Sequence, residues 1–249
     1  MIDSHMHINS KFTRTPYKEI CKTTYNIDLT HVINVGLDIE TSKEISIYAR
    51  RNPKMYCSIG IHPLYIDNQD INELYSMVTD KVVAIGEIGL DSNDPNYQIQ
   101  RRYLIEQIII ANELKLPVII HSNNSNQEII KIFETIVKPQ YGCVFHCFQP
   151  ELNILKYLVK NGYYVSFAGK ITQPNAKKSL EVIKNVPEDL YLVETDSPYM
   201  VPYPLDDKYN HSNNLPYIIN RIAEVKKIEP EKVEEQTTKN TLRLFKKMH

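Results

Sequence analysis

Short apolar segments rich in β-branched residues recur eight times along the chain, and each predicts a buried strand. Their starts lie roughly 20 to 35 residues apart, which leaves room for one crossover helix and two loops between successive strands. The eight predicted strands span residues 2–7, 31–36, 55–60, 82–87, 117–121, 142–146, 163–167 and 190–195.

The stretches between these strands place apolar residues at mixed spacings of three and four, which is typical of amphipathic helices. Eight strand–helix units in 249 residues match the size and rhythm of a (β/α)8 barrel. We therefore predict an α/β fold in which residues 1–249 form a single-domain TIM barrel. The predicted helices span residues 39–51, 97–115, 126–137, 151–161 and 174–185, and two more, at 216–226 and 230–247, close the chain.

An open, doubly wound α/β sheet is the alternative fold. It is disfavoured because no GxGxxG motif follows the first predicted strand. The sequence AGKIT at 168–172 resembles part of a phosphate-binding P-loop, but Tyr164 stands where the first glycine of that motif is needed. The barrel therefore remains the prediction.

The composition is that of an ordinary globular protein, with 42% hydrophobic and 24% charged residues. The 29 Lys and Arg residues nearly balance the 30 Asp and Glu residues, for a formal net charge of -1. This balance excludes a broadly basic surface that binds nucleic acid through bulk charge, but it leaves room for a local basic or metal-charged groove. The four cysteines are too few for a disulfide framework and fit a reducing compartment.

The chain has no recognisable signal for export or membrane insertion. Its first residues, MIDSHMHINS, contain neither a basic n-region nor an apolar h-region, so no signal peptide is predicted. The most apolar stretch, residues 103–120, is interrupted by charged and polar residues, which argues against a membrane span. We expect a soluble cytoplasmic protein with no membrane partner.

Two histidines on the first predicted strand are candidate metal ligands. His5 and His7 are two residues apart, so on a strand their side chains point to the same face. Two imidazoles on one face suit a divalent metal and are costly to bury as packing alone. Isolated His-x-His pairs without a metal are common, so this prediction depends on further ligands.

Four more residues of ligand type stand at the ends of other predicted strands. Glu87 ends the fourth strand, His121 the fifth and His146 the sixth, and Asp196 follows the eighth. The carboxyl ends of the strands form the rim where the active sites of TIM barrels assemble. Charged residues also end strands because loops begin there, but this does not readily place only His, Glu and Asp at the tips of five strands. The pattern predicts a metal site on the rim.

These motifs resemble those of the TatD-type metal-dependent deoxyribonucleases of the amidohydrolase superfamily. The resemblance runs nearly from end to end, through DSHMH, GIHP at 60–63, GEIGLD, LPVIIHS, FHCF, VSFAGKIT and ETDSPY, in the family's order. It implies that Glu87 bridges when two ions are bound. It also implies a set of six metal ligands, all of them present: His5, His7, Glu87, His121, His146 and Asp196.

Metal-assisted hydrolysis is the chemistry that such a ligand set supports. A bound divalent cation lowers the pKa of a water, which becomes a nucleophile near neutral pH. We expect two cations from among Zn, Mn, Mg, Co and Ni, because mixed His and carboxylate ligands do not select one metal. We expect two catalytic carboxylates, Glu87 as the bridging ligand and Asp196 as both a ligand and the proton acceptor for the attacking water.

Three residues near the predicted ligands are candidates for supporting roles. Glu194, two residues before Asp196, either orients a ligand histidine or is a buried carboxylate satisfied by the barrel. His62, in GIHP, is a candidate substrate-phosphate contact or leaving-group acid, and a locally satisfied loop histidine is the alternative. Lys170 is a candidate phosphate contact, with an ordinary surface lysine as the alternative.

The cysteines do not predict a zinc site. Cys143 and Cys147 flank His146, but strand alternation turns Cys143 away from that histidine. Cys21 and Cys57 are distant in sequence, so no four-cysteine site is evident. We predict reduced, structural thiols.

The chain departs from the family's pattern where arginines are usual. Asn123 stands where the family often has Arg after the strand-five His-Ser, and Gln149-Pro150 replaces Ser-Gly after FHCF. The basic loop after ETDSPY is replaced by VPYPLDDKYNHSNN, which adds Asp206 and Asp207. Arginines hold phosphates by bidentate hydrogen bonds, so their loss weakens the recognition of nucleic acid and leaves the metal ligands intact.

Three functions follow from the sequence. The first is a metal-dependent DNase, acting as an exonuclease because a closed barrel mouth admits a strand end more easily than a duplex. The second keeps the metals and changes the substrate to another phosphoester, the ester of an aminoacyl-tRNA or a small amide. The third is a non-catalytic binding protein with structural metal, which six candidate ligands on an open rim disfavour.

Overall fold

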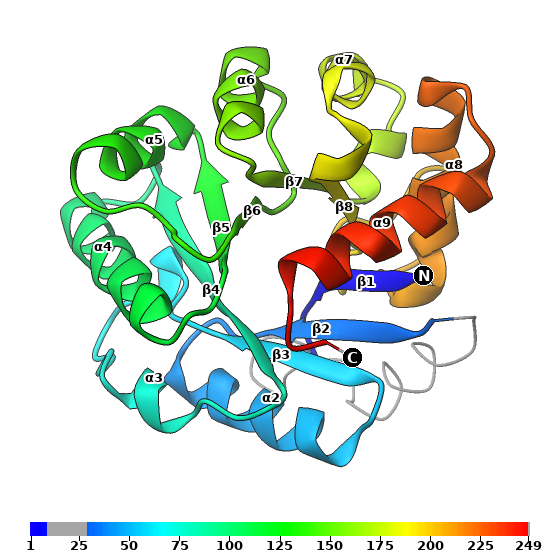
Figure 1. Ribbon diagram of the computed structural model, residues 1–249. Coiled ribbons are helices and arrows are strands. Elements are labelled where there is room, and N and C mark those ends of the chain that lie inside the picture. Colours follow the sequence, from blue (N-terminus) through cyan, green and yellow to red (C-terminus); the bar gives the residue numbers. More distant parts are fainter. Residues whose placement is uncertain (9–28, 249) are drawn as a thin grey trace.

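Each of the eight apolar segments forms a strand, and together they confirm the predicted TIM barrel. The computed structural model describes residues 1–8 and 29–248, and the strands found there are parallel and lie in chain order in one sheet (Figure 1). They are β1 (Ile2–Met6), β2 (His31–Val35), β3 (Met55–Ile59), β4 (Val82–Asp91), β5 (Val118–Asn123), β6 (Cys143–Phe145), β7 (Tyr164–Phe167) and β8 (Tyr191–Val193).

The barrel closes between β1 and the segment that follows β8. The backbone N–H of Asp196 donates to the carbonyl of His5 (2.9 Å), and that of His7 donates to the carbonyl of Ser197 (2.7 Å). The Ser4 hydroxyl adds a bond to the carbonyl of Val193 (2.9 Å). These bonds bring the two ends of the sheet together where β1 carries its histidines.

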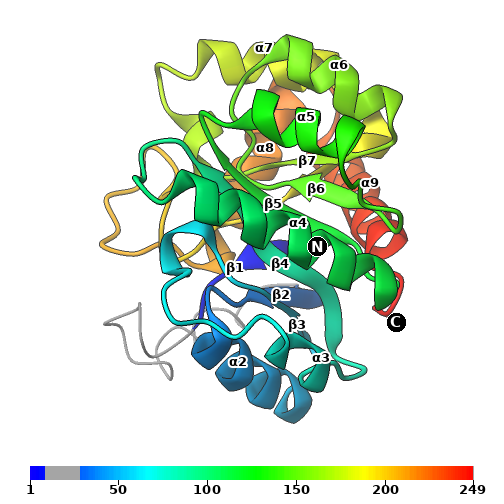
Figure 2. The same cartoon turned by 90° about the vertical axis from the view of Figure 1, so that its left-hand side faces the viewer.

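The helices lie outside the strands and cover the sheet (Figures 1 and 2). The short α3 is an addition to the predicted set. The helices are α2 (Ile39–Arg51), α3 (Glu73–Ser76), α4 (Tyr97–Glu113), α5 (Asn126–Thr135), α6 (Leu152–Lys160), α7 (Lys177–Asn185), α8 (Leu215–Lys226) and α9 (Pro230–Leu244). The loops contain short 3-10 turns, which are η1 (Pro63–Tyr65), η2 (Gly169–Thr172), η3 (Glu188–Leu190) and η4 (Ser212–Asn214).

Local sequence explains where α2 begins and ends. Its N-cap Asp38 accepts a hydrogen bond from the backbone N–H of Thr41 (2.8 Å), and the Thr41 hydroxyl accepts from the N–H of Asp38 (3.0 Å). This reciprocal capping box satisfies N–H groups that the helix itself leaves free. Arg50 and Arg51 in the last turn complement the negative end of the helix dipole.

Two apolar layers hold the barrel together. The larger cluster lies between the strands and the surrounding helices. The smaller one draws side chains from every strand, including Ile33, Ile119 and Leu192, and therefore fills the barrel interior. Residues of the carboxyl-terminal segment, Phe245 and Met248 among them, join this inner cluster. The last residue of α9 and the segment after it thus plug the barrel interior at the amino ends of the strands.

The described cysteines are unpaired thiols, as predicted. Cys57, Cys143 and Cys147 form no disulfide, and Cys21 lies outside the described residues. Burial raises the pKa of Cys57 and of Cys147 to about 12, so both thiols stay protonated at neutral pH.

Across residues 1–8 and 29–248, none of the helices combines the length and apolar character that a membrane crossing requires.

Candidate metal centre

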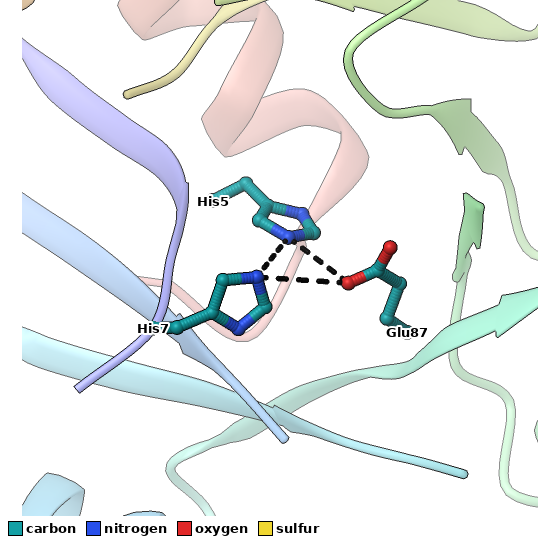
Figure 3. A group of neighbouring side chains, drawn as sticks. All are labelled: His5, His7 and Glu87. Atoms are coloured by element: carbon teal, nitrogen blue, oxygen red, sulfur yellow. Dashed lines mark hydrogen bonds and ion pairs between the residues drawn. The ribbon is translucent and has the colours of Figure 1, made fainter. Parts of the chain in front are cut away.

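The two histidines of β1 meet a carboxylate from β4 at the carboxyl ends of the strands. Figure 3 shows His5, His7 and Glu87 pointing toward one another. The Nε2 atoms of His5 and His7 are 3.1 Å apart and lie 3.3 and 3.7 Å from Glu87 Oε2. Asp196 Oδ1 completes this group, at 3.3 Å from His7 Nε2 and 3.8 Å from His5 Nε2.

A second group of histidines surrounds the other oxygen of Glu87. His146 Nε2 lies 2.6 Å from Glu87 Oε1, and His121 Nδ1 lies 2.8 Å from it. His62 Nε2 is also near, at 3.5 Å. The carboxylate therefore separates two sets of imidazoles, with one oxygen facing each set.

Close packing of β4 against β5 brings Glu87 and His121 together. Gly89 has a φ of +159°, and a Cβ at this position would lie 1.9 Å from the carbonyl oxygen of His121. Only glycine allows this approach of the two backbones. The pairing continues through Leu90 with Ser122 and Asp91 with Asn123, so both strands extend beyond their predicted ends.

Hydrogen bonds at the far nitrogens fix the tautomers of His7 and His62 differently. His7 Nδ1 lies 3.0 Å from the carbonyl oxygen of Val35, which can only accept, so Nδ1 carries the proton and Nε2 offers a lone pair to the cluster. His62 Nδ1 accepts from the backbone N–H of Leu64 (3.1 Å), so neutral His62 carries its proton on Nε2. His7 is thus set up as a ligand and His62 as a hydrogen-bond donor.

The charges of the cluster are mutually dependent. Burial alone raises the pKa of Glu87, but the imidazoles of His146 and His62, with the hydrogen bonds of His121, outweigh it and hold that pKa well below its ordinary range. Burial lowers the pKa of His146, but Glu87 and Glu194 overcome this and raise it well above its ordinary value. The cluster stabilises ionised carboxylates and holds positive charge beside them.

The donor set fits divalent cations. Ligand atoms of His5, His7 and Glu87 all lie within 4.8 Å of one another, and nitrogens of His121 and His146 lie beside the other oxygen of Glu87. Buried nitrogens of the cluster, His121 Nε2 among them, have no hydrogen-bond partner in the part of the chain described. Imidazole nitrogens and carboxylate oxygens that converge in this way suit first-row divalent metals.

Glu194 and Asp196, the two carboxylates after β8, are held in different ways. Glu194 accepts from the backbone N–H of Cys147 (2.7 Å) and from the hydroxyl of Ser166 (2.6 Å). Its Oε1 lies 3.5 Å from His146 Nδ1. Asp196 has a φ of 54°, an uncommon backbone conformation for a residue other than glycine, and such conformations cluster at functional sites. Glu194 therefore lies beside a histidine and is also hydrogen-bonded by the barrel, so its surroundings fit both of the alternatives that the sequence left open.

The candidate substrate contacts lie in different surroundings. His62 is buried within the cluster, with its Nε2 at 3.5 Å from Glu87 Oε1. Lys170 is exposed on η2 and stands outside the cluster, although its charge lowers the pKa of Cys147 slightly against the dominant effect of burial. The structure thus brings together His62 and the six predicted ligands, and it leaves Lys170 at the rim.

Sequence reasoning missed the buried residues that position the cluster. Asp3 accepts from the hydroxyls of Thr195 (2.6 Å) and Ser212 (2.7 Å), which ties β1 to the segment after β8. Gln107 on α4 bonds both the N–H (2.7 Å) and the carbonyl (3.0 Å) of Ile61, next to His62. Asp3 stands next to the histidine motif, and this position in the sequence could have identified it. Nothing in the sequence indicates that Gln107 contacts Ile61, which is 46 positions away.

Amides occupy the positions where the resemblance expects other residues. The amide nitrogen of Gln149 donates to Asn123 Oδ1 (3.1 Å), and the amide nitrogen of Asn123 donates to Asp91 Oδ2 (3.1 Å). This chain of bonds links the carboxyl ends of β4 and β5 with the loop after β6. Asp206 and Asp207 lie exposed in the loop after β8.

Comparisons with known proteins agree with the resemblance. A family model described as TatD related DNase matches residues 2–246. YabD of Bacillus subtilis, named an uncharacterized metal-dependent hydrolase, is 31% identical and is covered over 99% of both chains. An uncharacterized metal-dependent hydrolase of Buchnera aphidicola subsp. Baizongia pistaciae is 34% identical, over 98% of this chain and 96% of that protein.

Solved structures give the same picture. YJJV, a TatD homolog from Escherichia coli, is 25% identical and superposes with a TM-score of 0.87 over 99% of this chain and 98% of its own. A TatD family hydrolase from Entamoeba histolytica, 19% identical, has the same fold, with a TM-score of 0.86 over 98% of this chain and 97% of its own. The match of the family model over nearly the whole chain shows that this protein belongs to the TatD family.

Proposed function

We propose that the protein is a divalent-metal-dependent hydrolase that cleaves the phosphodiester bonds of DNA from a strand end. The single observation that carries this proposal is the position of Glu87, whose two oxygens face separate groups of imidazoles. A bridging carboxylate of this kind suits two cations, drawn from Zn, Mn, Mg, Co or Ni. The proposed ligands are His5, His7, Glu87, His121, His146 and Asp196.

Bound divalent cations supply two things to hydrolysis: a water with a lowered pKa and a positive field for the phosphate. The chain supplies the proton transfers and the positioning. Asp196 Oδ1, beside the β1 histidines, accepts the proton of the attacking water. Glu194 orients His146 through its Nδ1, since a carboxylate in this position fixes the ring and raises its basicity.

Two further residues bind the substrate in this proposal. His62 donates from Nε2 to a phosphate oxygen, because the Leu64 N–H occupies its Nδ1 as donor. The pKa of His62 lies well below its ordinary value, chiefly through burial, so the imidazole acts as a neutral donor. Lys170 contacts a more exposed phosphate from the rim.

A second candidate is hydrolysis of a different ester or amide, such as the ester of an aminoacyl-tRNA or a small phosphoester. It is favoured by Asn123, which stands where the resemblance expects a phosphate-binding arginine and whose amide is engaged by Gln149 and Asp91 instead. The exposed Asp206 and Asp207 also repel a long polyanion. Both candidates share the metal centre and differ in the bond that is cleaved.

The experiment incubates purified protein with end-labelled single- and double-stranded DNA in EDTA, Mg, Mn and Zn, with His121→Ala as the inactive control. We expect progressive shortening that needs metal and disappears in the variant. No cleavage of DNA, together with turnover of an aminoacyl-tRNA or of bis(p-nitrophenyl) phosphate, would replace the first candidate by the second. Metal binding without turnover of any substrate would contradict both.

A further inference from the structure

A pocket of about 410 Å³ opens beside the metal centre, at the carboxyl ends of β6 and β7. Figures 1 and 2 show α6 and α7 side by side outside these two strands. The pocket is lined by the segment after β6, the end of β7 with η2, and the first turn of α7. None of the six proposed metal ligands lines it, so it is a separate cavity on the same rim.

One carboxylate connects this pocket to the metal centre. Cys147 and Ser166 form part of the pocket wall, and both donate hydrogen bonds to Glu194. Glu194 in turn lies 3.5 Å from His146. A ligand in the pocket is therefore separated from the His146 side of the cluster by a single side chain.

The lining of the pocket combines an apolar floor with a cationic rim. Phe148 and Ile171 are buried side chains of the floor, with Phe167 beside them. Lys170, Lys177 and Lys178 stand at the rim, where all three are exposed. Among the described residues, none that lines the pocket is acidic and these lysines form no ion pair, so their charge is available to a ligand.

The first turn of α7 adds to the positive character of the rim. No side chain caps this helix, although its first residues line the pocket. Uncapped N–H groups at a helix start favour an anion. Here they accompany three lysines and an apolar floor, and the combination suits a flat ring that carries a phosphate. The volume lies in the range of about 300–1,000 Å³ that is typical of small-ligand sites.

We infer that this pocket, which we call the β6–β7 pocket, binds one nucleotide of the substrate strand, with the base on the apolar floor and a phosphate among the lysines. The inference rests on the proposed nuclease function. It adds a binding site for the nucleotide next to the cleaved bond. A base can enter the pocket only when it is unstacked, so the pocket favours single-stranded ends over duplex.

The test compares the metal-loaded wild-type protein with two double variants that change the charge equally. Lys177→Glu with Lys178→Glu reverses the rim of the pocket. Lys156→Glu with Lys160→Glu is the matched control, because both residues are exposed on α6 and neither lines the pocket. The probes are deoxynucleoside 5′-monophosphates, deoxyribose 5-phosphate and inorganic phosphate, with metal content verified as equal in all three proteins.

We expect the Kd for the nucleotides to rise at least tenfold in the rim variant and to stay within twofold in the control. Phosphate affinity should fall only in the rim variant, and deoxyribose 5-phosphate, which lacks the base, should bind the wild type at least tenfold more weakly than a nucleotide. Equal nucleotide affinity in all three proteins would overturn the inference. So would an equal loss in both variants, which indicates bulk charge, or equal binding of nucleotide and deoxyribose 5-phosphate.

Hydrolysis of bis(p-nitrophenyl) phosphate separates this inference from the proposed function. Turnover of this diester by the wild-type protein reports whether the metal centre hydrolyses phosphodiesters, whatever the pocket binds. Nucleotide binding that depends on Lys177 and Lys178 in a protein that cleaves no DNA would refute the nuclease and leave the pocket standing. Cleavage of DNA without such dependence would do the reverse.

Discussion

The two ends of the barrel are built from the same strands but from opposite kinds of side chain. At the amino ends, apolar residues such as Ile33 and Ile119 fill the interior, and Phe245 closes it. At the carboxyl ends, the interior is filled by histidines around the buried carboxylate of Glu87. Burial of apolar surface at the amino ends stabilises the fold. Burial of charged groups at the carboxyl ends costs free energy unless those groups have partners.

This contrast indicates a division between the two ends: the amino ends of the strands serve stability, and the carboxyl ends serve metal binding and hydrolysis. Substitutions at the plugged end should change the free energy of unfolding and leave metal binding unaltered. Substitutions at the histidine end should change metal binding and hydrolysis more than stability.

Removing Glu87 should have the largest effect on function. Glu87→Ala removes the carboxylate that both groups of imidazoles share, so we expect the content of bound metal to fall below two ions and hydrolysis to drop by about 10³ or more, given several kcal/mol of lost charge stabilisation. Elemental analysis gives the metal content and circular dichroism checks the fold. An unchanged metal count would refute the bridging role.

Removing the plug should have the largest effect on stability. Phe245 is fully buried in the inner cluster, so Phe245→Ala should lower the free energy of unfolding by about 3–5 kcal/mol. Leu242→Ala is the control, because Leu242 lies in the last turn of α9, just before Phe245, and is 37% exposed. Urea unfolding measures both variants. A Phe245→Ala protein that keeps its stability but loses metal would contradict the division between the two ends.

Glu194→Gln should have an intermediate effect. The amide keeps the size of the side chain but no longer offers a charged partner to His146, so metal affinity or hydrolysis should fall about 10–100-fold. Glu188→Gln, an exposed substitution on η3, serves as the control. Metal titration and initial rates measure the change. If both variants behave like the wild type, Glu194 is only a satisfied buried carboxylate.

Asp3 should give a smaller, pH-dependent effect on stability. Burial, opposed by hydrogen bonds from Thr195 and Ser212, raises the pKa of Asp3 from 3.8 to about 6. The native protein then binds more protons than the unfolded chain between these values, so this contribution to stability is present at low pH and is lost as pH rises through 6. From pH 5 to 7.5 the wild type should lose about 1.4 kcal/mol relative to Asp3→Asn.

Urea unfolding of the EDTA-treated proteins at the two pH values measures this difference. Groups other than Asp3 titrate in both proteins, so their contribution drops out when the variant is subtracted from the wild type. The same difference at both pH values would mean that the hydrogen bonds from Thr195 and Ser212 keep Asp3 ionised in the native state.

The sequence predicted most of the fold because each strand is a short apolar segment with clear ends. It failed at β4 and β5, which run on to Asp91 and Asn123. Ser122 and Asn123 are polar and indicate a loop, yet they pair with β4 because Gly89 lets the backbones approach. The helix predicted from residue 174 begins at Lys177, after the turn η2.

The candidate site was predictable as far as residue type and strand position allowed. Histidines and carboxylates at strand tips converge in any barrel with this register, and these do. The contacts that orient them were not predictable. Ser212 donates a hydrogen bond to Asp3, which is 209 positions away in the sequence. Gln107 contacts Ile61, next to His62, but in the sequence it is an ordinary polar residue of a helix.

The central claim is that Glu87 bridges two divalent cations, one on each carboxylate oxygen. Anomalous diffraction from crystals grown with Mn or Zn tests it most directly. We expect two anomalous peaks, one between Glu87 Oε2 and the β1 histidines and one between Glu87 Oε1 and the pair His121 and His146. A single peak, or peaks away from Glu87, would contradict it.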